Sequence, residues 1–445
     1  MYEPVIGLEV HVELNTKSKM FCRCSADYFG KKPNTQTCPV CLGLPGSLPY
    51  INKQAIEDCM KIGLALNCEI SKKSLFERKN YFYPDLAKGY QISQLRWPLC
   101  IKGWIEVDPP SHKASEGQET SRIRINRVHQ EEDTGKLTHS GSETLIDFNR
   151  SSVPLVEIVT EPDFKDSSQI KDYAKKLQQI FRYLGVSDAD MEKGQMRLEA
   201  NISVRKVGQK QLPAYRVELK NINSFRFMVA AVEYEIKRQI EALEKGEKLV
   251  QETKGWNEDK KQTFTQRVKE EANDYRYFPE PDLPEMQFEE SKIKDLESNL
   301  PELPWKKLEQ FIEKYGINES SARILTEDKD LAGFFEQLVE LGKKEGVLAK
   351  DIANYVVNQK IDLLNDSPQQ IIDDIKAKKT NLISDDSQLE KVAKEVISEN
   401  PQMVETYKKG KVTIIQALIG VVMKKTAGKA DATKVKIILE SLLNL

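Results

Sequence analysis

Apolar and polar side chains alternate along several short segments in the first two-thirds of the chain. Residues 6–14 place isoleucine, leucine and valine at nearly every second position, with Glu9 and His11 between them. The same alternation recurs in residues 197–205 and 216–220. Because successive side chains of a β-strand point to opposite faces of a sheet, this period predicts antiparallel strands that bury one face against a core.

Helical periodicity accompanies these strands and dominates the last third of the chain. Apolar side chains follow helical spacing in residues 167–184 and 227–243, and again in residues 320–341 and 348–364. Strands mixed with helices, followed by helices alone, predict an α+β fold. We expect an N-terminal part of antiparallel sheet and helices, then an all-α domain and a C-terminal helical tail.

The length of 445 residues is too great for a single compact core. Prolines recur between residues 279 and 304, which predicts a linker rather than a regular element. The polar segment 378–387 predicts a second hinge. We therefore expect three domains, which cover residues 1–292, 293–380 and 381–445.

Hydropathy and charge exclude several classes of protein. No apolar stretch reaches the roughly 18–20 residues of a membrane span, and the N-terminus lacks the features of a signal peptide. The 67 basic and 69 acidic residues nearly cancel, so binding of nucleic acid would need a local basic patch. Residues 407–445 contain eight lysines and only two acidic residues. This basic tail can contact RNA phosphates, or it can be the solvated face of a helix.

Four of the seven cysteines cluster near the N-terminus. Cys22 and Cys24 form a C-x-C pair, and after thirteen intervening residues Cys38 and Cys41 form a C-x-x-C pair. Four thiolates satisfy tetrahedral Zn²⁺, and a closed site of this kind is structural. The alternative is four unrelated buried thiols. An odd number of cysteines argues against a disulfide framework and favours a reducing, cytoplasmic compartment.

The polar faces of the predicted strands carry an unusual mixture of side chains. Glu9 and His11 share one face, and Glu199 and Glu218 lie on two others, interleaved with arginine, asparagine or lysine. Glutamates and an imidazole that converge from neighbouring strands would form the oxygen-rich site that Mg²⁺ prefers when it bridges phosphates. For any single strand the simpler alternative is a solvated outer face. The sequence has no glycine-rich nucleotide loop, so a nucleotide would be held by metal and sheet residues.

Longer segments carry a resemblance to a known family. They are VIGLEVHVEL, RKNYFYPDLAKGYQISQ, HQEEDTGK, DFNRSSVPLVEIVTEPD, GQMRLEANISVR, VELKNINSF, NDYRYFPEPDLP and GKVTIIQALIGVVMKKTAGKADA. In order, and over essentially the whole chain, they resemble the B subunit of the glutamyl/aspartyl-tRNA amidotransferase. The resemblance implies a cradle similar to the catalytic sheet of glutamine synthetase.

The resemblance also implies an activity and a set of site residues. ATP phosphorylates the side-chain carboxylate of glutamate or aspartate on a misacylated tRNA, and ammonia then displaces the phosphate. The implied catalytic residues and Mg²⁺ ligands are Glu9, His11, Glu131 or Glu132, Glu199 and Glu218. The implied Zn²⁺ ligands are Cys22, Cys24, Cys38 and Cys41. On charge alone, the candidates for phosphate contact are Arg150, Arg197, Arg205 and Arg276.

Two further implications concern the partners and the departures from the family pattern. No amide-hydrolase signature is present, so the resemblance implies an amidase A subunit, a small C subunit and a tunnel for ammonia. Many relatives carry Cys-Asp where this chain has Leu198 and Glu199, which keeps the charge but extends the carboxylate. The helical region near residues 364–390 is shorter than in relatives.

Two other functions compete with the amidotransferase hypothesis. The chain can be a non-catalytic, zinc-stabilised adaptor that binds tRNA and whose acidic strands are structural. It can also be a metal-dependent hydrolase that uses the same carboxylates on water. The adaptor predicts no ATP hydrolysis, and the hydrolase predicts turnover without ATP.

Overall fold

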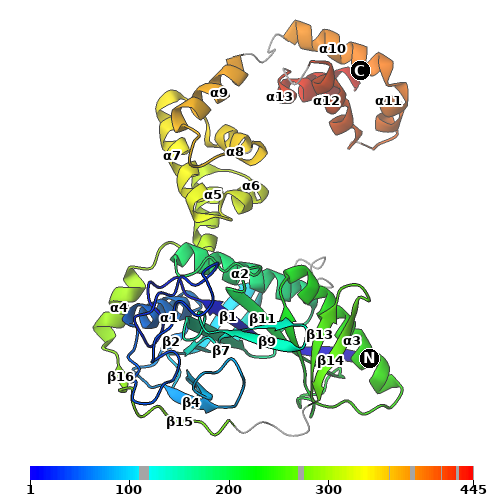
Figure 1. Cartoon of the computed structure of the whole chain (residues 1–445). Helices are drawn as coiled ribbons and strands as arrows, with labels where there is room; N and C mark the ends of the chain where they lie inside the picture. The colour runs from blue at the N-terminus through cyan, green and yellow to red at the C-terminus, as the bar shows by residue number, and fades with distance from the viewer. Residues whose placement is uncertain are drawn as a thin grey trace. The chain divides into compact units, whose positions relative to one another are not determined.

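A computed structural model describes residues 1–109, 120–268, 275–359, 361–380, 386–411, 413–426 and 430–443 (Figure 1). The chain divides into two compact units, Met1–Lys307 and Leu308–Leu445. The first unit contains a large sheet with helices, and the described elements of the second unit are helices. The predicted α+β fold with a helical C-terminal part is therefore confirmed. The predicted domain boundaries after residues 292 and 380 stay a prediction.

A nine-stranded sheet forms the centre of the first unit. In spatial order its strands are β14 (Gln262–Val268), β13 (Glu252–Asn257), β12 (Val217–Ile222), β11 (Met196–Lys206), β1 (Tyr2–Glu13), β10 (Pro154–Thr160), β7 (Ser121–Glu132), β6 (Cys100–Val107) and β2 (Glu69–Ile70). Only the β12–β13 pair is parallel among these neighbours. The first strand of the chain thus lies in the middle of the sheet, between strands that follow much later.

Helices pack on one face of this sheet. They are α1 (Lys53–Ala65), α2 (Ser167–Leu184) and α3 (Phe225–Glu244), of which α1 contacts β7 and α3 contacts β11 (Figure 1). Ile6, Leu8 and Val10 of β1 belong to the core that these helices cover. The predicted apolar face of β1 is therefore confirmed, and α2 has the predicted bounds. Its last turn ends at Gly185, whose φ of 67° is the left-handed conformation that glycine adopts without strain.

A small second sheet lies beside the polar face of the large one. Its strands are β15 (Phe278–Pro279), β4 (Glu77–Asn80) and β5 (Tyr90–Ser93). The β5 strand contacts β7, and the Ser93 hydroxyl donates a hydrogen bond to Glu131 over 3.1 Å. Two short ribbons complete the strands of the unit: β3 (Lys73–Ser74) with β16 (Met286–Gln287), and β8 (Lys136–Ser140) with β9 (Glu143–Asp147).

The proline-rich segment 279–304 is not the linker that the sequence predicted. It contains β16 and the helix α4 (Glu290–Ser298), and its Ile293 and Leu296 pack against the core of the first unit. Pro279 lies in the short strand β15, whereas Pro281, Pro284 and Pro301 lie between elements. Pro304 occupies the first position of the next helix, where the missing N–H has no partner to lose.

The second unit consists of helices around two hydrophobic clusters. The helices are α5 (Pro304–Tyr315), α6 (Glu319–Leu325), α7 (Lys329–Glu345), α8 (Ala349–Asn358), α9 (Pro368–Thr380), α10 (Asp386–Glu399), α11 (Pro401–Lys408), α12 (Ile414–Lys425) and α13 (Ala432–Leu443). One cluster surrounds Phe335 and Leu338, and the other surrounds Leu418 and Leu439. Within the described residues, no helix combines the length and apolar character needed to cross a bilayer.

Two helix predictions in this unit were wrong in extent. The expected helix 320–341 is divided between α6 and α7, because the Asp328 side chain accepts hydrogen bonds from the N–H groups of Asp330 and Leu331 and so starts a new helix. The helix expected to reach residue 364 ends at Asn358. The core of the predicted second hinge, residues 381–385, lies outside the described residues.

Gly63 of α1 gives a testable prediction about this packing. A Cβ atom at Gly63 would lie 2.3 Å from Cys100 Sγ and 2.8 Å from Cys100 Cβ. Although alanine is favoured over glycine in helices by about 1 kcal/mol, we expect Gly63→Ala to lower the free energy of unfolding by about 1–3 kcal/mol. Denaturant unfolding followed by tryptophan fluorescence and circular dichroism measures the change.

Gly333 of α7 is the matched control for this substitution. A Cβ atom at Gly333 would meet no atom within 4 Å. We therefore expect Gly333→Ala to stabilise its unit by about 0.4–1 kcal/mol. Equal effects of the two substitutions would contradict the close packing of α1 on β6.

Candidate active site and cysteine centre

Titratable side chains form a row across four neighbouring strands on the polar face of the large sheet. Arg197 of β11 lies opposite His11 of β1, His11 lies opposite Glu157 of β10, and Glu157 lies opposite His129 of β7. Side chains in directly opposed positions of an antiparallel pair have Cβ atoms about 4.5–5.5 Å apart, close enough to interact. The strand register therefore brings together groups from four distant parts of the sequence.

Part of this row forms a first donor group: His11, Glu131 and Glu157. One donor atom from each of the three lies within 4.8 Å of the others. His11 Nε2 is 3.6 Å from an oxygen of Glu131 and 3.6 Å from an oxygen of Glu157. His129 Nε2 approaches Glu157 at 3.3 Å from the other side. All four side chains are largely buried.

Burial and charge act in opposite directions on this first group. Burial alone would lower the pKa of His11, but contacts with Glu157 and Glu131 raise it to about 9. Burial would raise the pKa of Glu157, and the imidazoles of His129 and His11 hold it well below its ordinary value. The carboxylate of Glu157 is therefore kept ionised inside the protein by the two imidazoles beside it.

A second donor group consists of Glu9, Glu199 and Glu218. Glu9 lies on β1, two residues before His11. The oxygens of the three glutamates also lie within 4.8 Å of one another. The Lys220 ammonium sits among them, 2.7 Å from Glu199 and 3.2 Å from Glu218. Asn201 donates a hydrogen bond to Glu9 over 2.9 Å. Burial, with Glu157 and Glu199 nearby, raises the pKa of Glu9, as expected where carboxylates crowd together.

The two groups differ from the single ion site that the sequence analysis expected. Glu9 and His11 point to the same face, but each joins a different set of neighbours. Glu132 belongs to neither group, because its carboxylate pairs with Lys88 and accepts a hydrogen bond from the Ile92 N–H over 3.0 Å. Both groups offer hard oxygen donors, and the first adds one imidazole. The donor sets therefore fit divalent cations such as Mg²⁺.

A third cluster adjoins the first and contains Arg150 and Arg197, two of the candidates for phosphate contact. Arg197 pairs with the buried Asp133. Arg150 donates to the carbonyl oxygens of Thr134 and Gly135 over 3.0 Å and 2.8 Å. Although burial opposes ionisation, Arg150 and Arg197 lower the pKa of Asp133. Both arginines thus lie at the polar face but already have partners.

Of the other two candidate arginines, Arg205 lies away from the donor groups, and Arg276 lies beside β4 of the small sheet. Arg205 donates to Glu3 over 2.6 Å near the far end of β1, six residues along the strand from the Glu9–Glu199 pair. Arg276 has a φ of 45°, and its carbonyl oxygen accepts a hydrogen bond from Asn80 over 2.9 Å. Arg205 is therefore about 20 Å from the second donor group along the strand.

The sequence analysis assigned no role to four residues of this face: Glu157, His129, Lys79 and Arg127. Lys79 of β4 faces the carboxylates of Glu131 and Glu157, which raise its pKa against the effect of burial. Arg127 of β7 has a buried Nε that finds no hydrogen-bond partner among the described residues. One signal was available for Glu157, since a single carboxylate in the otherwise apolar run PLVEIVT must be either paired or functional.

A cavity of about 540 Å³ opens beside Glu9 and Asn201. Part of its wall is apolar, with Val5, Val159, Leu212 and Pro213. The polar part of the wall comprises Glu9, Thr160, Asn201, Ser203, Arg216 and Gln251. A cavity of this size is in the range that holds a nucleotide-sized ligand.

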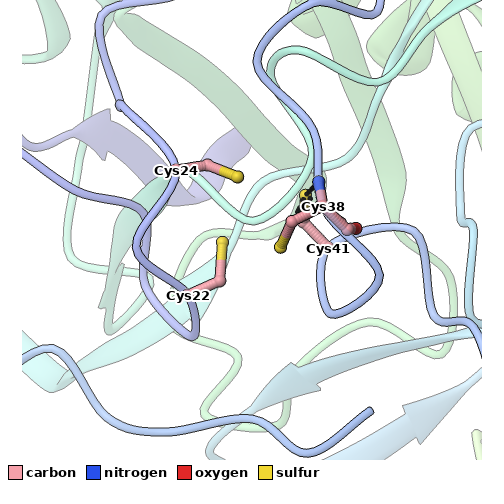
Figure 2. Close-up of side chains that lie close together, drawn as sticks. All are labelled: Cys22, Cys24, Cys38 and Cys41. Carbon is pink, nitrogen blue, oxygen red and sulfur yellow. Dashed lines mark hydrogen bonds between the residues drawn. The ribbon is translucent and has the colours of Figure 1, made fainter. Parts of the chain in front are cut away.

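The four clustered cysteines form a separate centre (Figure 2). Cys22 and Cys24 face Cys38 and Cys41 from an opposing loop, and the four sulfurs lie within 4.8 Å of one another. Tetrahedral zinc with bonds of about 2.3 Å separates its sulfur ligands by about 3.8 Å. The Sγ atoms of Cys38 and Cys41 are 3.9 Å apart, so the arrangement fits that metal. The hydrogen bond from Cys22 and the charge of Lys19 lower the pKa of Cys41 to about 5, despite partial burial.

Comparison with known protein families finds two matches along the chain. Residues 4–294 match the family described as the GatB/GatE catalytic domain, and residues 317–443 match the family described as the GatB domain. The sheet with its two donor groups lies in the first match, and the matched domains define a catalytic component of an amidotransferase.

Curated relatives narrow this class to one family. The B subunit of the aspartyl/glutamyl-tRNA(Asn/Gln) amidotransferase of Persephonella marina is 44% identical over 99% of each chain, and that of Thermodesulfovibrio yellowstonii is also 44% identical over 99% of each. The corresponding protein of Caldanaerobacter subterraneus subsp. tengcongensis is 45% identical over 97% of each chain. The chain therefore belongs to the family of B subunits of tRNA-dependent amidotransferases, ligases of protein biosynthesis.

Proposed function

We propose that this chain uses ATP to phosphorylate the side-chain carboxylate of glutamyl-tRNA(Gln), aspartyl-tRNA(Asn) or both, and then converts the acyl phosphate to an amide. The observation that carries the proposal is the pair of donor groups, His11–Glu131–Glu157 and Glu9–Glu199–Glu218, side by side on one face. A carboxylate has no leaving group, and transfer of a phosphoryl group supplies one.

The proposed reaction balances in two steps. The γ-phosphoryl group passes from ATP to a carboxylate oxygen of the aminoacyl side chain, and ADP leaves. Ammonia then forms the C–N bond, the C–O bond to phosphate breaks, and one ammonia proton leaves with the phosphate. The product is glutaminyl-tRNA(Gln) or asparaginyl-tRNA(Asn).

The residues of the polar face have distinct parts in this proposal. The two donor groups hold Mg²⁺, which when bound screens the two anions that must meet. Lys220, Lys79 and Arg127 supply fixed positive charges along the same face, suited to phosphoryl oxygens. We assign the nucleotide base to the apolar part of the cavity beside Glu9, which puts its phosphates toward the second donor group.

Ammonia must come from another protein in this proposal. We propose an amidase A subunit as its source and a small C subunit that completes a heterotrimer, and the naming of the relatives as one subunit of an enzyme agrees with such an assembly. Misacylated tRNA is the second partner, and the lysine-rich C-terminal tail is the segment suited to its phosphates. We further propose a structural Zn²⁺ at the four cysteines and a cytoplasmic location.

Reconstitution tests the proposed reaction. The chain is combined with its A and C subunits, and each misacylated tRNA is assayed with ATP, Mg²⁺ and glutamine. We expect amide formation that requires ATP, together with ADP release that requires the misacylated tRNA. The preferred tRNA identifies the substrate.

Two outcomes would replace the proposal. Complete absence of tRNA-dependent ADP release, with or without the partner subunits, would favour the zinc-stabilised adaptor. Hydrolytic turnover that needs no ATP would favour the metal-dependent hydrolase.

A further inference from the structure

A lysine lies inside the protein against the cysteine centre. The Lys19 side chain has an exposed fraction of 0%. Its Nζ is 3.6 Å from Cys41 Sγ and 3.3 Å from the carbonyl oxygen of Phe148. Its backbone N–H donates to the carbonyl oxygen of Cys24 over 3.0 Å. Both the backbone N–H and the side-chain ammonium of Lys19 thus form hydrogen bonds with residues of the cysteine cluster.

The surroundings of Lys19 lack the usual partner of a buried ammonium. Among the residues that the structure describes, no carboxylate forms an ion pair with it, and its two polar contacts are a sulfur and a carbonyl oxygen. Burial of an ammonium is costly unless a negative charge accompanies it. A carbonyl dipole supplies only part of that charge, so the sulfur of Cys41 must supply the rest.

We infer that Lys19 is the charge partner of the four-cysteine centre and increases its affinity for zinc. Four thiolates around Zn²⁺ carry a formal charge of −2, and the centre lies in a partly buried site. The adjacent ammonium reduces the local charge to −1. The Lys19 ammonium also donates a hydrogen bond to Sγ of Cys41, a buried cysteine of the cluster, where water cannot replace the ammonium. This inference deepens the zinc assignment made above and does not depend on the proposed phosphoryl transfer.

Lys19 acts through Cys41 and is not itself a ligand. An ammonium has no lone pair for a metal, and its contact with Cys41 Sγ leaves the four sulfurs as the complete donor set. Partners of metal ligands orient them and tune their charge, and loss of one typically weakens binding about 10–100-fold. Lys19 is therefore a positioning residue of the metal centre.

Competition with a chelator tests the inference. The full chain is prepared as wild type, Lys19→Met and Lys17→Met, each loaded with zinc and titrated with a chromogenic chelator. Methionine keeps the length of the side chain and removes its charge. We expect Lys19→Met to weaken zinc binding about 10–100-fold. Lys17 lies two residues away and is exposed, so Lys17→Met should match the wild type.

A stability measurement separates this role from simple packing. Thermal unfolding is recorded for each variant with zinc and after its removal. If Lys19 acts through the charged sulfurs, Lys19→Met destabilises the zinc-loaded protein more than the zinc-free protein. If Lys19 is only a packed core residue bonded to Phe148, the loss is the same in both forms, and that result would overturn the inference. Lys19→Arg keeps the charge and should restore part of the affinity for zinc.

The remaining outcomes also decide the matter. Should Lys19→Met fail to fold, Lys19→Gln keeps a hydrogen-bond donor without the charge and must show the same loss of affinity. Equal zinc affinity in the neutral variants and the wild type refutes the role of Lys19 while leaving the zinc site intact. A wild type that binds no zinc refutes both.

Discussion

Glu9→Gln is expected to abolish ATP-dependent amide formation while the assembled complex continues to hydrolyse glutamine. The substitution removes one of three carboxylates that form the second donor group. It therefore lowers the negative charge that surrounds Lys220 and any bound cation. Loss of one electrostatic group aimed at a developing charge typically costs about 10²–10³ in rate, and Glu9 is also one of the proposed cation ligands. Both activities are measured on one preparation, so that a failure of assembly is recognised.

His11→Ala is the companion substitution in the first donor group. It removes the imidazole that lies between Glu131 and Glu157, and we expect the same loss of amide formation with the same retained glutaminase activity. Glu3→Gln is the control. It makes the same chemical change as Glu9→Gln on the same strand, but Glu3 pairs with Arg205 far from both donor groups. Unimpaired amide formation in Glu9→Gln and His11→Ala would defeat the assignment.

Cys38→Ser is expected to remove the zinc from the chain. Elemental analysis of the purified wild type should give about one zinc per chain, as a site of four thiolates holds, and the variant should retain little. Because metal binding and local folding are coupled, the zinc-free variant should also unfold at a lower temperature. The loop that carries Cys38 and Cys41 is also held by hydrogen bonds to residues 146–151, among them one from Ser151 to the Cys41 carbonyl oxygen, so we expect the variant to remain folded.

Cys59→Ser is the matched control for the loss of a thiol. Cys59 lies in the hydrophobic core of the first unit and outside the cysteine cluster. This variant should keep its zinc even where burial of the hydroxyl lowers its stability. A wild type that folds without metal, or equal zinc content in Cys38→Ser and wild type, would contradict the zinc site.

Local patterns in the sequence predicted much of the first unit. The alternation around Ile6 and Leu8 identified β1 and its buried face, because a sheet with one covered face imposes that period. The bounds of α2 followed from its regular apolar spacing, and in the structure Asp166 caps its start and Gly185 follows its end. These signals are local, and each depends on residues only a few positions apart.

What could not be predicted depends on pairing between distant strands. Glu9 and His11 share a face, as expected, but the register decides that Glu9 meets Glu199 while His11 meets Glu157. Long-range pairing also determines the length of β7, which continues to Glu132. Pairing with β10 extends β7. The side chain of the buried Gln130 donates a hydrogen bond there to the Leu155 carbonyl oxygen.

The errors in the helical region have a different physical cause. The prolines between residues 279 and 304 were correct signs of interruption, but they interrupt between short elements that still pack against the core. The division between α6 and α7 had a local sign in Asp328, since aspartate at such a position caps a new helix. Apolar spacing that continues across the interruption concealed it.

The central place of β1 in the large sheet has a consequence for synthesis. Its two neighbours, β10 and β11, begin at Pro154 and Met196. After β1 is made, the ribosome must therefore add roughly 140 further residues before β1 can pair with the first of them. At about 5–20 residues per second, the ribosome needs about 7–28 s to add these residues. During that time an apolar strand has two open edges, and a nascent chain of this kind is a natural client for chaperones that shield such edges.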